Sequence, residues 1–355
     1  MGITKTGSNP SKQFGERKKG LENIASVSSS SGQNNNRRPQ THDNWQGDRE
    51  RGNNNFNRNG NGGGNRGGED WGDHNGGSPF YPIPSGIVDQ VKKSSANFSL
   101  SFIRLMRWTL NGNEIKKPAD VIESLYKVGQ EQIRQAQVNA ALEAIHQRQK
   151  EAMESLGKLP IEIRAKLVSP FISGLGSGHP NETGIILDRN TGCPFLPASS
   201  IKGVLRLAYA LKLADDNHSI VEIDKDGQAT IDDKYLDKYF GSTNTEKGKR
   251  GQLVILDAYP AKAPSLKIDI MNPHYGDYYI GKKKSPVETE NPVPIKFISV
   301  AKDTEFIFRA FFLPLEAESF NDSDKQEIEG AFKEAFEYVG FGGKTAIGYG
   351  RFKIK

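Results

Sequence analysis

The run GFGGKTAIGYG, residues 340–350, is the most specific stretch of the sequence and the one from which the fold is read. It repeats a glycine–aromatic–glycine triplet across a gap of five residues. Glycine adopts positive φ angles and lets another backbone approach closely, so Gly340, Gly342, Gly348 and Gly350 predict a tight, irregular loop. A helix end followed by a glycine-rich hairpin explains the same pattern equally well.

Cationic side chains accompany this loop. An irregular glycine loop can present amide N–H groups to phosphates, and Lys344 and Arg351 would supply the counter-charge. Gly343-Lys344-Thr345 also ends like a nucleotide-binding P-loop, but that motif requires a glycine where Tyr338 stands, and it opens a helix instead of following one. The sequence therefore excludes ATP or GTP hydrolysis at this loop.

Outward from the loop, residues 160–355 alternate between short β-type runs and two helices. One helix begins at the serine pair 199–200, and the other begins near Asp322 and stops at Gly340. The strand-like runs are IEIRAKLV, GIILD, QLVILDAY, LKIDI, PIKFISV, EFIFRAFFL and IGYGRFKI. This order of strands and helices indicates an α+β domain built on a βαββαβ-like sheet.

A second informative stretch is SGLGSGHPNETGIILDRNTGCPFLPASSIKGVLR, residues 173–206. Its glycines predict a pliable loop, followed by a helix that Ser199 and Ser200 cap. Lys202 and Arg206 are four residues apart, so they share one face of that helix. A helix N-terminus with hydroxyls and a nearby lysine can bind a phosphate. On spacing alone, a well-capped helix with two solvated cations is favoured.

A third stretch, DIMNPHYGDYYIGKKK at residues 269–284, places tyrosines beside lysines. Tyr275 and its neighbours can stack on bases while the lysines neutralise a nucleic-acid backbone. Tyrosine is also enriched at protein interfaces. Both interpretations therefore stay open.

Upstream of the α+β domain, residues 1–80 have a different composition. They contain 16 Gly and 14 Asn but only five residues from Ile, Leu, Val and Met. This is too little apolar surface to offset backbone entropy, so we expect a disordered tail that either binds RNA loosely or only aids solubility. Residues 87–110 and 119–156 read as helices with apolar stripes. We therefore expect a helical segment at 81–158 and the α+β domain at 159–355.

Composition excludes several classes of protein. The 355-residue chain has a net charge of +5 and a mean hydropathy of −0.63. Three of those charges lie in residues 1–80, so any basic site must be a local patch. The single cysteine, Cys193, excludes a disulfide framework and a cysteine-based zinc site. No apolar run suits a membrane helix or a signal sequence, so we expect a soluble, cytoplasmic protein without a membrane partner.

Catalytic constellations are weak in this sequence. The six histidines show no metal-ligand spacing, no paired carboxylates support a metal site, and a Gly-x-Ser-x-Gly elbow is absent. His179 and His274 could each act as a general base for RNA cleavage. A lone loop histidine is more often a hydrogen-bonding group. We therefore assign no catalytic residue, no metal and no cofactor.

Taken together, these residues resemble the RAMP superfamily, the ferredoxin-like RNA-binding proteins of CRISPR systems. The glycine loop is similar to the signature of that superfamily. The stretch 173–206, LDAYPA (256–261), DIMNPHYGDYY (269–279) and NPVPIKFISV (291–300) are similar, in the same order, to the sixth RAMP subunit of type III-B (Cmr) effector complexes. The resemblance covers residues 160–355 and implies a ferredoxin-like (RRM-like βαββαβ) RAMP domain.

The resemblance also implies a non-catalytic role in antiviral defence. The implied subunit holds the guide crRNA toward its 3′ part and caps the backbone filament, while target cleavage belongs to the backbone subunit. Its implied partners are guide crRNA, target RNA, and the backbone and capping RAMP subunits of the Cmr complex. The RNA-binding residues are then Ser199, Ser200, Lys202, Arg206, Gly340, Gly342, Lys344, Gly348, Gly350 and Arg351, with His179, His274 and Tyr275 as additional candidates.

Two other functions stay open at this point. A metal-independent endoribonuclease that processes CRISPR repeat RNA would share the glycine loop, with His179 or His274 as the base and Lys202 beside the departing oxyanion. A purely protein-binding cap would use the tyrosine stretch as its interface and would assemble without RNA. Cleavage of repeat RNA and RNA-free assembly are the observations that separate the three functions.

Overall fold

The computed structural model describes most of the chain from residue 97 onward. Contacts between Cα atoms divide the chain after residue 76, and residues 77–355 form one unit. The expected disordered tail, 1–80, lies outside the described residues except for its last three positions, which form β1 (Ser78–Phe80). The described residues are 78–81, 83–84, 86–87, 97–111, 114–116, 121–217, 220–223, 229–242, 248–273, 275, 278, 281–285, 294–313 and 319–355.

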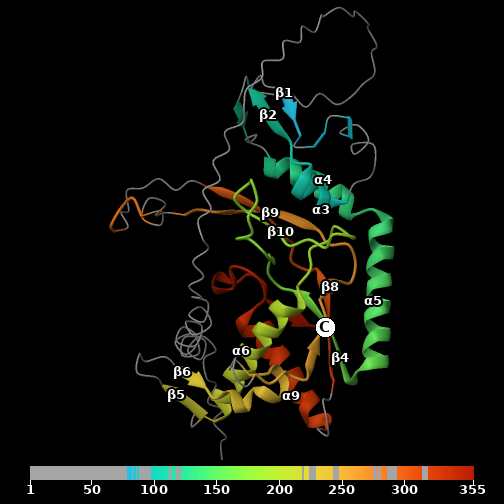
Figure 1. Cartoon of the computed structure of the whole chain (residues 1–355), viewed down its shortest axis with the longest axis vertical. Helices are drawn as coiled ribbons and strands as arrows, with labels where there is room; N and C mark the ends of the chain where they lie inside the picture. The colour runs from blue at the N-terminus through green and yellow to red at the C-terminus, as the bar shows by residue number, and fades with distance from the viewer. Residues whose placement is uncertain are drawn as a thin grey trace, which may run out of the picture. The chain divides into compact units, whose positions relative to one another are not determined.

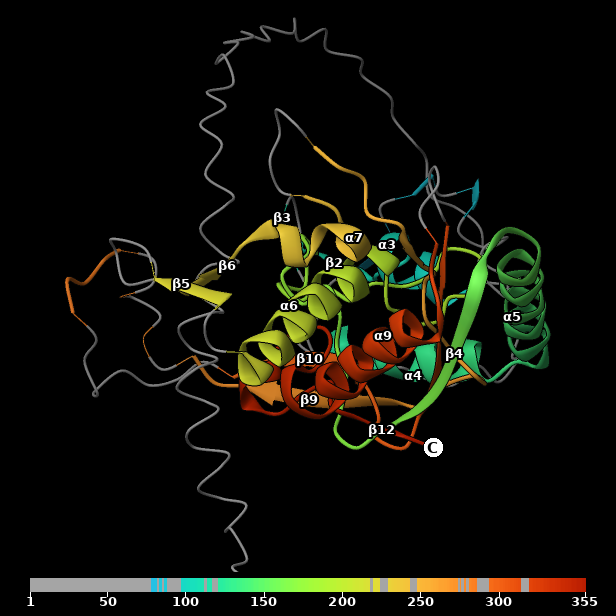
Figure 2. The same ribbon diagram turned by 90° about the horizontal axis from the view of Figure 1, so that it is seen from below.

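One antiparallel sheet organises residues 158–355 (Figures 1 and 2). Its strands are, in spatial order, β12 (Phe352–Ile354), β4 (Lys158–Leu167), β11 (Glu305–Phe312) and β7 (Leu253–Ile255), and β8 (Tyr259–Pro260) also pairs with β11. Helix α6 (Ala198–Asp216) leads from β4 to β7, and α9 (Asp322–Glu334) leads from β11 to β12. The expected mixed α+β class is confirmed.

Alternation along the strands produces the main core. In β4, every second residue from Ile161 to Leu167 is buried, while Glu162, Arg164 and Lys166 point to the other face. The buried face packs against α6 and α9, which contact each other and lie on the same side of the sheet (Figure 2). Aromatic rings fill this layer: Phe171, Phe306, Phe308, Phe312, Phe332, Phe336, Phe341 and Phe352. Burial of each ring contributes about 1.5–3 kcal/mol, which makes this layer the main source of stability.

Helix α9 begins and ends where its sequence predicts. The Asn321 side chain accepts hydrogen bonds from the Ser323 and Asp324 amides, and the Asp324 carboxylate accepts one from the Asn321 amide at 2.9 Å. The helix continues as a π-helical turn, η3 (Ala335–Val339), and stops at Gly340, whose φ is 77°. The glycine loop therefore starts from a rigid helix end.

A second core lies on the N-terminal helices. It joins α3 (Phe98–Arg104), α4 (Val121–Ile133) and α5 (Ala136–Leu156) to a two-stranded sheet of β9 (Leu266–Met271) and β10 (Ile295–Val300). The runs LKIDI and PIKFISV thus form their own hairpin beside the main sheet. This hairpin meets the helices through Leu266 and Ile298.

The expected helix over 87–110 is wrong in part. Helix α3 spans seven residues, and the chain then enters β2 (Trp108–Asn111), which pairs with β1 and with β3 (Glu114–Lys116). The Asn97 side chain fixes the helix start, because it accepts the Leu100 amide and donates to the Arg189 carbonyl. The single helix expected over 119–156 is two helices, since Gln135 is extended.

Two further differences concern strands. GIILD (184–188) forms only an isolated bridge between Leu187 and Pro194. The chain turns there because the Asp188 carboxylate accepts the Asn190 and Thr191 amides. Three small elements were not expected: the hairpin β5 (Val221–Ile223) with β6 (Ala229–Ile231), the 3₁₀ turn η2 (Asp233–Tyr235) and the short helix α7 (Asp237–Phe240).

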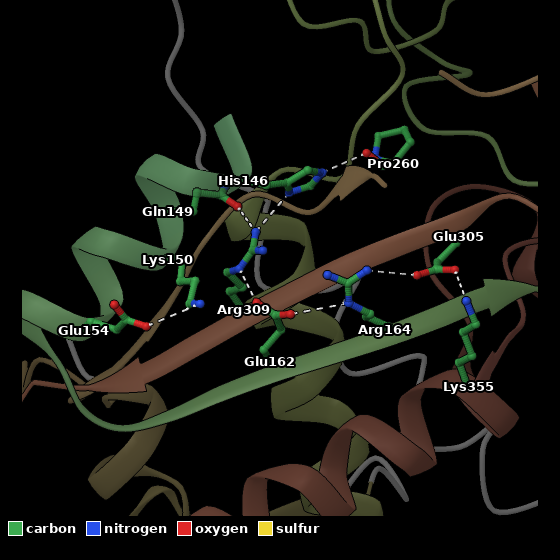
Figure 3. Close-up of polar contacts among 10 residues, drawn as sticks. All are labelled: His146, Gln149, Lys150, Glu154, Glu162, Arg164, Pro260, Glu305, Arg309 and Lys355. Atoms are coloured by element: carbon green, nitrogen blue, oxygen red, sulfur yellow. Dashed lines mark hydrogen bonds and ion pairs between the residues drawn. The ribbon is translucent and has the colours of Figure 1, made fainter. Parts of the chain in front are cut away.

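Helix α5 covers part of the opposite face of the sheet through a polar network around Arg309 (Figure 3). The Arg309 side chain is only 3% exposed, and its Nε lies 2.9 Å from Oε2 of Glu162, its cross-strand partner. Its Nη1 donates to Nδ1 of His146 at 3.0 Å and to Oε1 of Gln149 at 2.8 Å. His146 therefore carries its proton on Nε2, which donates to the Pro260 carbonyl at 2.9 Å.

Candidate functional site

The glycine loop, residues 340–350, connects η3 to β12. The four outer glycines of its two triplets have φ angles from 67° to 96°. A Cβ atom at Gly342 would lie 2.2 Å from the Ile172 carbonyl oxygen, and one at Gly350 would lie 1.9 Å from that of Phe341. Other residues cannot take these positions without displacing the backbone. The triplets are therefore required by the internal packing of the loop.

The amide groups of the loop are largely occupied. Gly343 donates to the Ile172 carbonyl at 2.7 Å, and Gly350 donates to that of Pro170 at 2.8 Å. Five more amides donate to backbone carbonyls within the loop or at the helix end: those of Gly340, Phe341, Ile347, Gly348 and Tyr349. The expected cradle of free amides is therefore wrong for these seven groups, because each N–H already has its acceptor. A phosphate at this loop therefore cannot rely on these seven amides and would need the side chains of the loop as well.

Lys344 is the loop cation with the clearest position. Its backbone is left-handed, with φ 60° and ψ 27°, at the start of the 3₁₀ turn η4 (Thr345–Ile347). Its ammonium lies 5.7 Å from the centroid of the Phe297 ring, which is fully buried in β10. A cation over an aromatic face gains electrostatic stabilisation. The β9–β10 hairpin thus holds this charge at the partly exposed surface of the loop.

A carboxylate fastens the second half of the loop to the same hairpin. The Tyr349 hydroxyl donates to Oδ2 of Asp269 at 2.6 Å, and Lys267 Nζ lies 3.3 Å from that oxygen. Partial burial alone would raise the pKa of Asp269, but the bonds from Tyr349, the Ile270 amide and Lys267 lower it. Burial and the bond to Asp269 raise the pKa of Tyr349 to about 12. Tyr349 therefore stays a hydrogen-bond donor at neutral pH.

Arg351 follows the loop and contacts it. Its Nη2 donates to the Thr345 carbonyl at 3.3 Å, and its amide donates to Ser169 Oγ at 3.0 Å. Burial lowers the pKa of the guanidinium, which still remains charged at physiological pH. A Cβ at Gly340 would lie 3.1 Å from Arg351 Nη1, so that glycine leaves room for the side chain. Part of the hydrogen-bonding capacity of Arg351 is thus used within the loop.

The start of α6 differs from the expectation. The helix begins at Ala198 after Pro197, and the Ala198 amide donates to Oδ1 of Asp257 at 2.7 Å. Ser199 and Ser200 are exposed residues of the first turn, so the expected serine cap is wrong. Asp257 replaces it because the Leu196–Ala258 bridge brings this residue to the helix end. A negative side chain at this terminus also opposes the phosphate expected there.

The cations of α6 have their own neighbours. Lys202 is half-buried, and its Nζ donates to the Leu253 carbonyl in β7 at 3.2 Å. Burial, and then the charge of Arg250, lower the pKa of Lys202. Arg206 lies one turn further along the helix. Lys202 thus faces β7 and Arg250, whereas Lys344 contacts the β9–β10 hairpin.

The expected site residues therefore fall into two groups. The glycine loop contacts Pro170 and Ile172, and the neighbouring Ser173 hydroxyl donates to the Phe195 carbonyl at 3.3 Å, two residues before the N-cap of α6. Helix α6 also packs against η3, which ends where the loop begins. Residues 170–173 and η3 thus link the two groups.

The candidate bases have different positions. Nδ1 of His179 accepts the Asn181 amide at 3.1 Å, so Nε2 carries the proton and donates to the Phe102 carbonyl at 2.9 Å. The ring also stacks on Phe102, with centroids 4.2 Å apart. Tyr275 is partly exposed just beyond β9, whereas His274 lies outside the described residues. His179 thus holds its loop against α3.

Sequence reasoning missed a set of cations on the main sheet. Arg164 and Lys166 on β4, and Lys353 and Lys355 at β12, are exposed on the face opposite α6 and α9. The signal was the alternation in IRAK and RFKIK, where every second residue is basic.

Within the described ranges, no group of three metal-ligating side chains is found. Among the helices of those ranges, none has the length and apolar character needed to span a membrane.

Similar proteins are found in sequence and in structure. The chain is 28% identical over 328 residues to the CRISPR system Cmr subunit Cmr6 of Pyrococcus furiosus, which covers 77% of this chain and 91% of the relative. It is 23% identical over 178 residues to the CMR subunit Cmr6 of Saccharolobus solfataricus, covering 49% of each chain. A chain of the type III-B Cmr-beta complex bound to cognate target RNA aligns with a TM-score of 0.45 and 18% identity, over 76% of this chain and 84% of that one.

The solved crystal structure of Cmr6 from Pyrococcus furiosus aligns with a TM-score of 0.33 and 27% identity, over 55% of this chain and 98% of that one. Residues 164–353, which include the glycine loop and most of the main sheet, match the model of the RAMP superfamily. Because this match spans more than half of the sequence, the chain belongs to the RAMP superfamily.

Proposed function

We propose that this protein is a non-catalytic, RNA-binding subunit of a type III-B CRISPR (Cmr) effector complex. The observation that carries the proposal is the similarity to the Cmr6 subunit of Pyrococcus furiosus, which extends over 91% of that relative. In this role the protein holds the guide crRNA toward its 3′ part and caps the backbone filament. Its neighbours are then the other Cmr RAMP subunits, with target RNA paired to the guide.

The domain that does this is, we infer, a ferredoxin-like βαββαβ unit. Strands β4, β7, β11 and β12 would be its first to fourth strands, with α6 and α9 as its two helices. Their spatial order is then fourth, first, third, second, and every neighbouring pair is antiparallel. Helices α3 to α5 lie outside this unit. The glycine loop comes directly before the fourth strand.

Binding at the loop would work through charge and shape. The packed loop and the Tyr349–Asp269 bond hold the Lys344 ammonium over Phe297 before any ligand arrives, so little side-chain entropy is lost on binding. A lysine contributes to RNA affinity by neutralising a phosphate, which carries no sequence information. Lys202 and Arg206, beyond the first residues of α6, would form a second contact group. A guide-binding protein needs this sequence independence.

The geometry of His179 supports a role without catalysis. A general base needs a free lone pair within reach of the proton that it removes. Both ring nitrogens of His179 are engaged with backbone groups, and the ring is stacked on Phe102. An endoribonuclease that uses this residue would have to break those contacts first. The other candidate base, His274, lies outside the described residues.

The proposal is tested with the full chain and labelled single-stranded RNA at several salt concentrations. Lys344→Asn removes the charge and suits the left-handed backbone, which asparagine tolerates. We expect weaker binding and a salt slope that is smaller by about 0.7, the value for one phosphate contact on a single strand. Lys333→Gln, at an exposed lysine of α9, should bind as the wild type does.

The outcomes separate the three functions. Equal RNA affinity for Lys344→Asn and the wild type would remove Lys344 from the site. Absence of RNA binding by the wild type, with intact assembly onto partner subunits, would support a purely protein-binding cap. Metal-independent cleavage of CRISPR repeat RNA, lost in His179→Ala, would support the endoribonuclease instead.

A further inference from the structure

Four basic residues form a block on the face of the main sheet opposite α6 and α9, and we call them the outer cation block: Arg164, Lys166, Lys353 and Lys355. Lys353 lies directly opposite Lys166 in the strand register. The Lys355 amide donates to the Arg164 carbonyl at 3.0 Å, which continues that register by two residues. Residues two apart on a strand share a face, so all four side chains project to the same side.

This arrangement is unfavourable in the isolated protein. Side chains directly opposite on adjacent antiparallel strands have Cβ atoms about 4.5–5.5 Å apart, and like charges there destabilise the sheet. Asp303 offsets one charge, because its Oδ1 lies 3.1 Å from Lys166 Nζ. Lys353 forms no ion pair within the part of the chain that the structure describes. One member of the central pair thus lacks a counter-charge.

The other carboxylates on this face are shared. Glu305 lies 2.9 Å from Lys355 Nζ and 3.5 Å from Arg164 Nη1, so one carboxylate serves two cations. These bonds lower the pKa of Glu305. Glu162 also approaches Arg164, at 3.5 Å, but its other oxygen is bound to Arg309. The outer cation block therefore keeps an excess of positive charge.

The block is accessible. The side chains of Arg164, Lys166 and Lys355 are 53%, 51% and 67% exposed. Helix α5 contacts the sheet around Arg309, and Figure 3 shows Arg164 and Lys355 farther from that helix than Arg309 is. The described residues thus leave the outer cation block exposed, whereas α5 covers the face around Arg309.

The block is also continuous with the glycine loop. Strand β12 starts two residues after Gly350. Arg351 lies between them, and its carbonyl accepts a hydrogen bond from the Val168 amide at 3.0 Å. The exposed alternate positions of β12 and of the end of β4 carry basic or aliphatic side chains and no aromatic ring. Such a face can neutralise phosphates, but it offers no aromatic platform for bases.

We propose that the outer cation block binds the sugar–phosphate backbone of RNA, as an extension of the Lys344 site along the exposed face of β12 and β4. The proposal rests on the proposed RNA-binding function. A polyanion is the complementary ligand, because phosphates laid across the block supply the negative charge that Asp303 and Glu305 provide only in part. The ligand is recognised by charge and spacing, without a base preference.

The test compares two double variants of the full chain for binding of labelled oligouridylate over a series of salt concentrations. Lys166→Gln with Lys353→Gln removes the opposed pair, and the expected salt slope is smaller by about 1.4, for two phosphate contacts. The same variant should have an unchanged or higher thermal midpoint, because a like-charge pair is gone. The control, Lys150→Gln with Lys333→Gln, removes the same charge from α5 and α9 and should bind as the wild type does.

The outcomes distinguish this proposal from the proposed function. If the wild type binds RNA and Lys344→Asn weakens that binding, but the Lys166/Lys353 double variant matches its control, the outer cation block is not an RNA site. If the double variant keeps RNA affinity and loses assembly with partner subunits, the block is a protein interface, and the proposal is wrong. If the wild type binds no RNA, both proposals fail together.

Discussion

Replacement of Arg309 by methionine tests whether the polar network under α5 determines the stability of the fold. Arg309 is 3% exposed and serves three partners, Glu162, His146 and Gln149, at 2.8–3.0 Å. Removing one member of a buried ion pair costs about 3–5 kcal/mol, since the other charge is left without its partner. Glu162 is 30% exposed and can regain water, so we expect the lower end, about 3 kcal/mol.

Chemical and thermal unfolding of the full chain measure this effect. A loss of about 3 kcal/mol corresponds to a fall in Tm of roughly 6–12 °C for a unit of this size. Lys150→Ala is the control, because the Lys150–Glu154 pair spans 3.9 Å with both side chains more than half exposed. Such a pair contributes about 0.3–0.5 kcal/mol.

The double variant Arg309→Met with Glu162→Gln sharpens the test. If the cost arises from the stranded charge, neutralising Glu162 should recover a large part of it. A loss below about 1 kcal/mol for Arg309→Met would contradict the reasoning. So would a double variant that is less stable than the single one.

Two further predictions concern the same unfolding experiments. Burial, together with the charges of Arg309 and Arg164, lowers the pKa of His146 below 6.5. As the pH falls, the unfolded chain therefore binds a proton at this histidine before the folded chain does. The free energy of unfolding should therefore fall as the pH decreases from about 7 to 5. In His146→Gln, the free energy of unfolding should depend less on pH over this range. An equal dependence in both proteins would exclude His146 as the cause. Gly350→Ala should lose more than about 2 kcal/mol, because it adds a left-handed alanine with its Cβ 1.9 Å from the Phe341 carbonyl oxygen. Gly203→Ala lies at an exposed α6 position with nothing within 4 Å of the added Cβ, so it should gain about 0.5–1 kcal/mol in the free energy of unfolding. A loss of stability in both variants would show that added Cβ atoms destabilise this fold in general.

Local signals in the sequence were sufficient for the main sheet and its helices. The alternation in IEIRAKL predicted β4, and Asn321 to Gly340 contained a complete helix with a start and a stop. These signals depend on neighbours within a few residues, so a single sequence carries them. The start of α3 depends instead on Asn97 bonding to the Arg189 carbonyl, 92 residues away, and the expected helix over 87–110 was too long.

The same limit applies to the candidate site. The glycine triplets correctly predicted a tight loop with positive φ angles. Their amides find acceptors at Pro170 and Ile172, which no local pattern announces, so the expected phosphate cradle was wrong for them. The serine cap failed for a similar reason, because its place is taken by Asp257 from a distant strand end. Long-range hydrogen bonds decide which polar groups remain available.

Asp257 joins two helices that cover opposite faces of the sheet. Its side chain accepts a hydrogen bond from the first amide of α6. Its main-chain carbonyl accepts one from Nε2 of Gln149 on α5, at 2.8 Å. Because Gln149 also binds Arg309, a hydrogen-bonded path runs around the sheet edge without entering the aromatic core. A shift of the Asp257 backbone would therefore disturb one hydrogen bond of each helix at once.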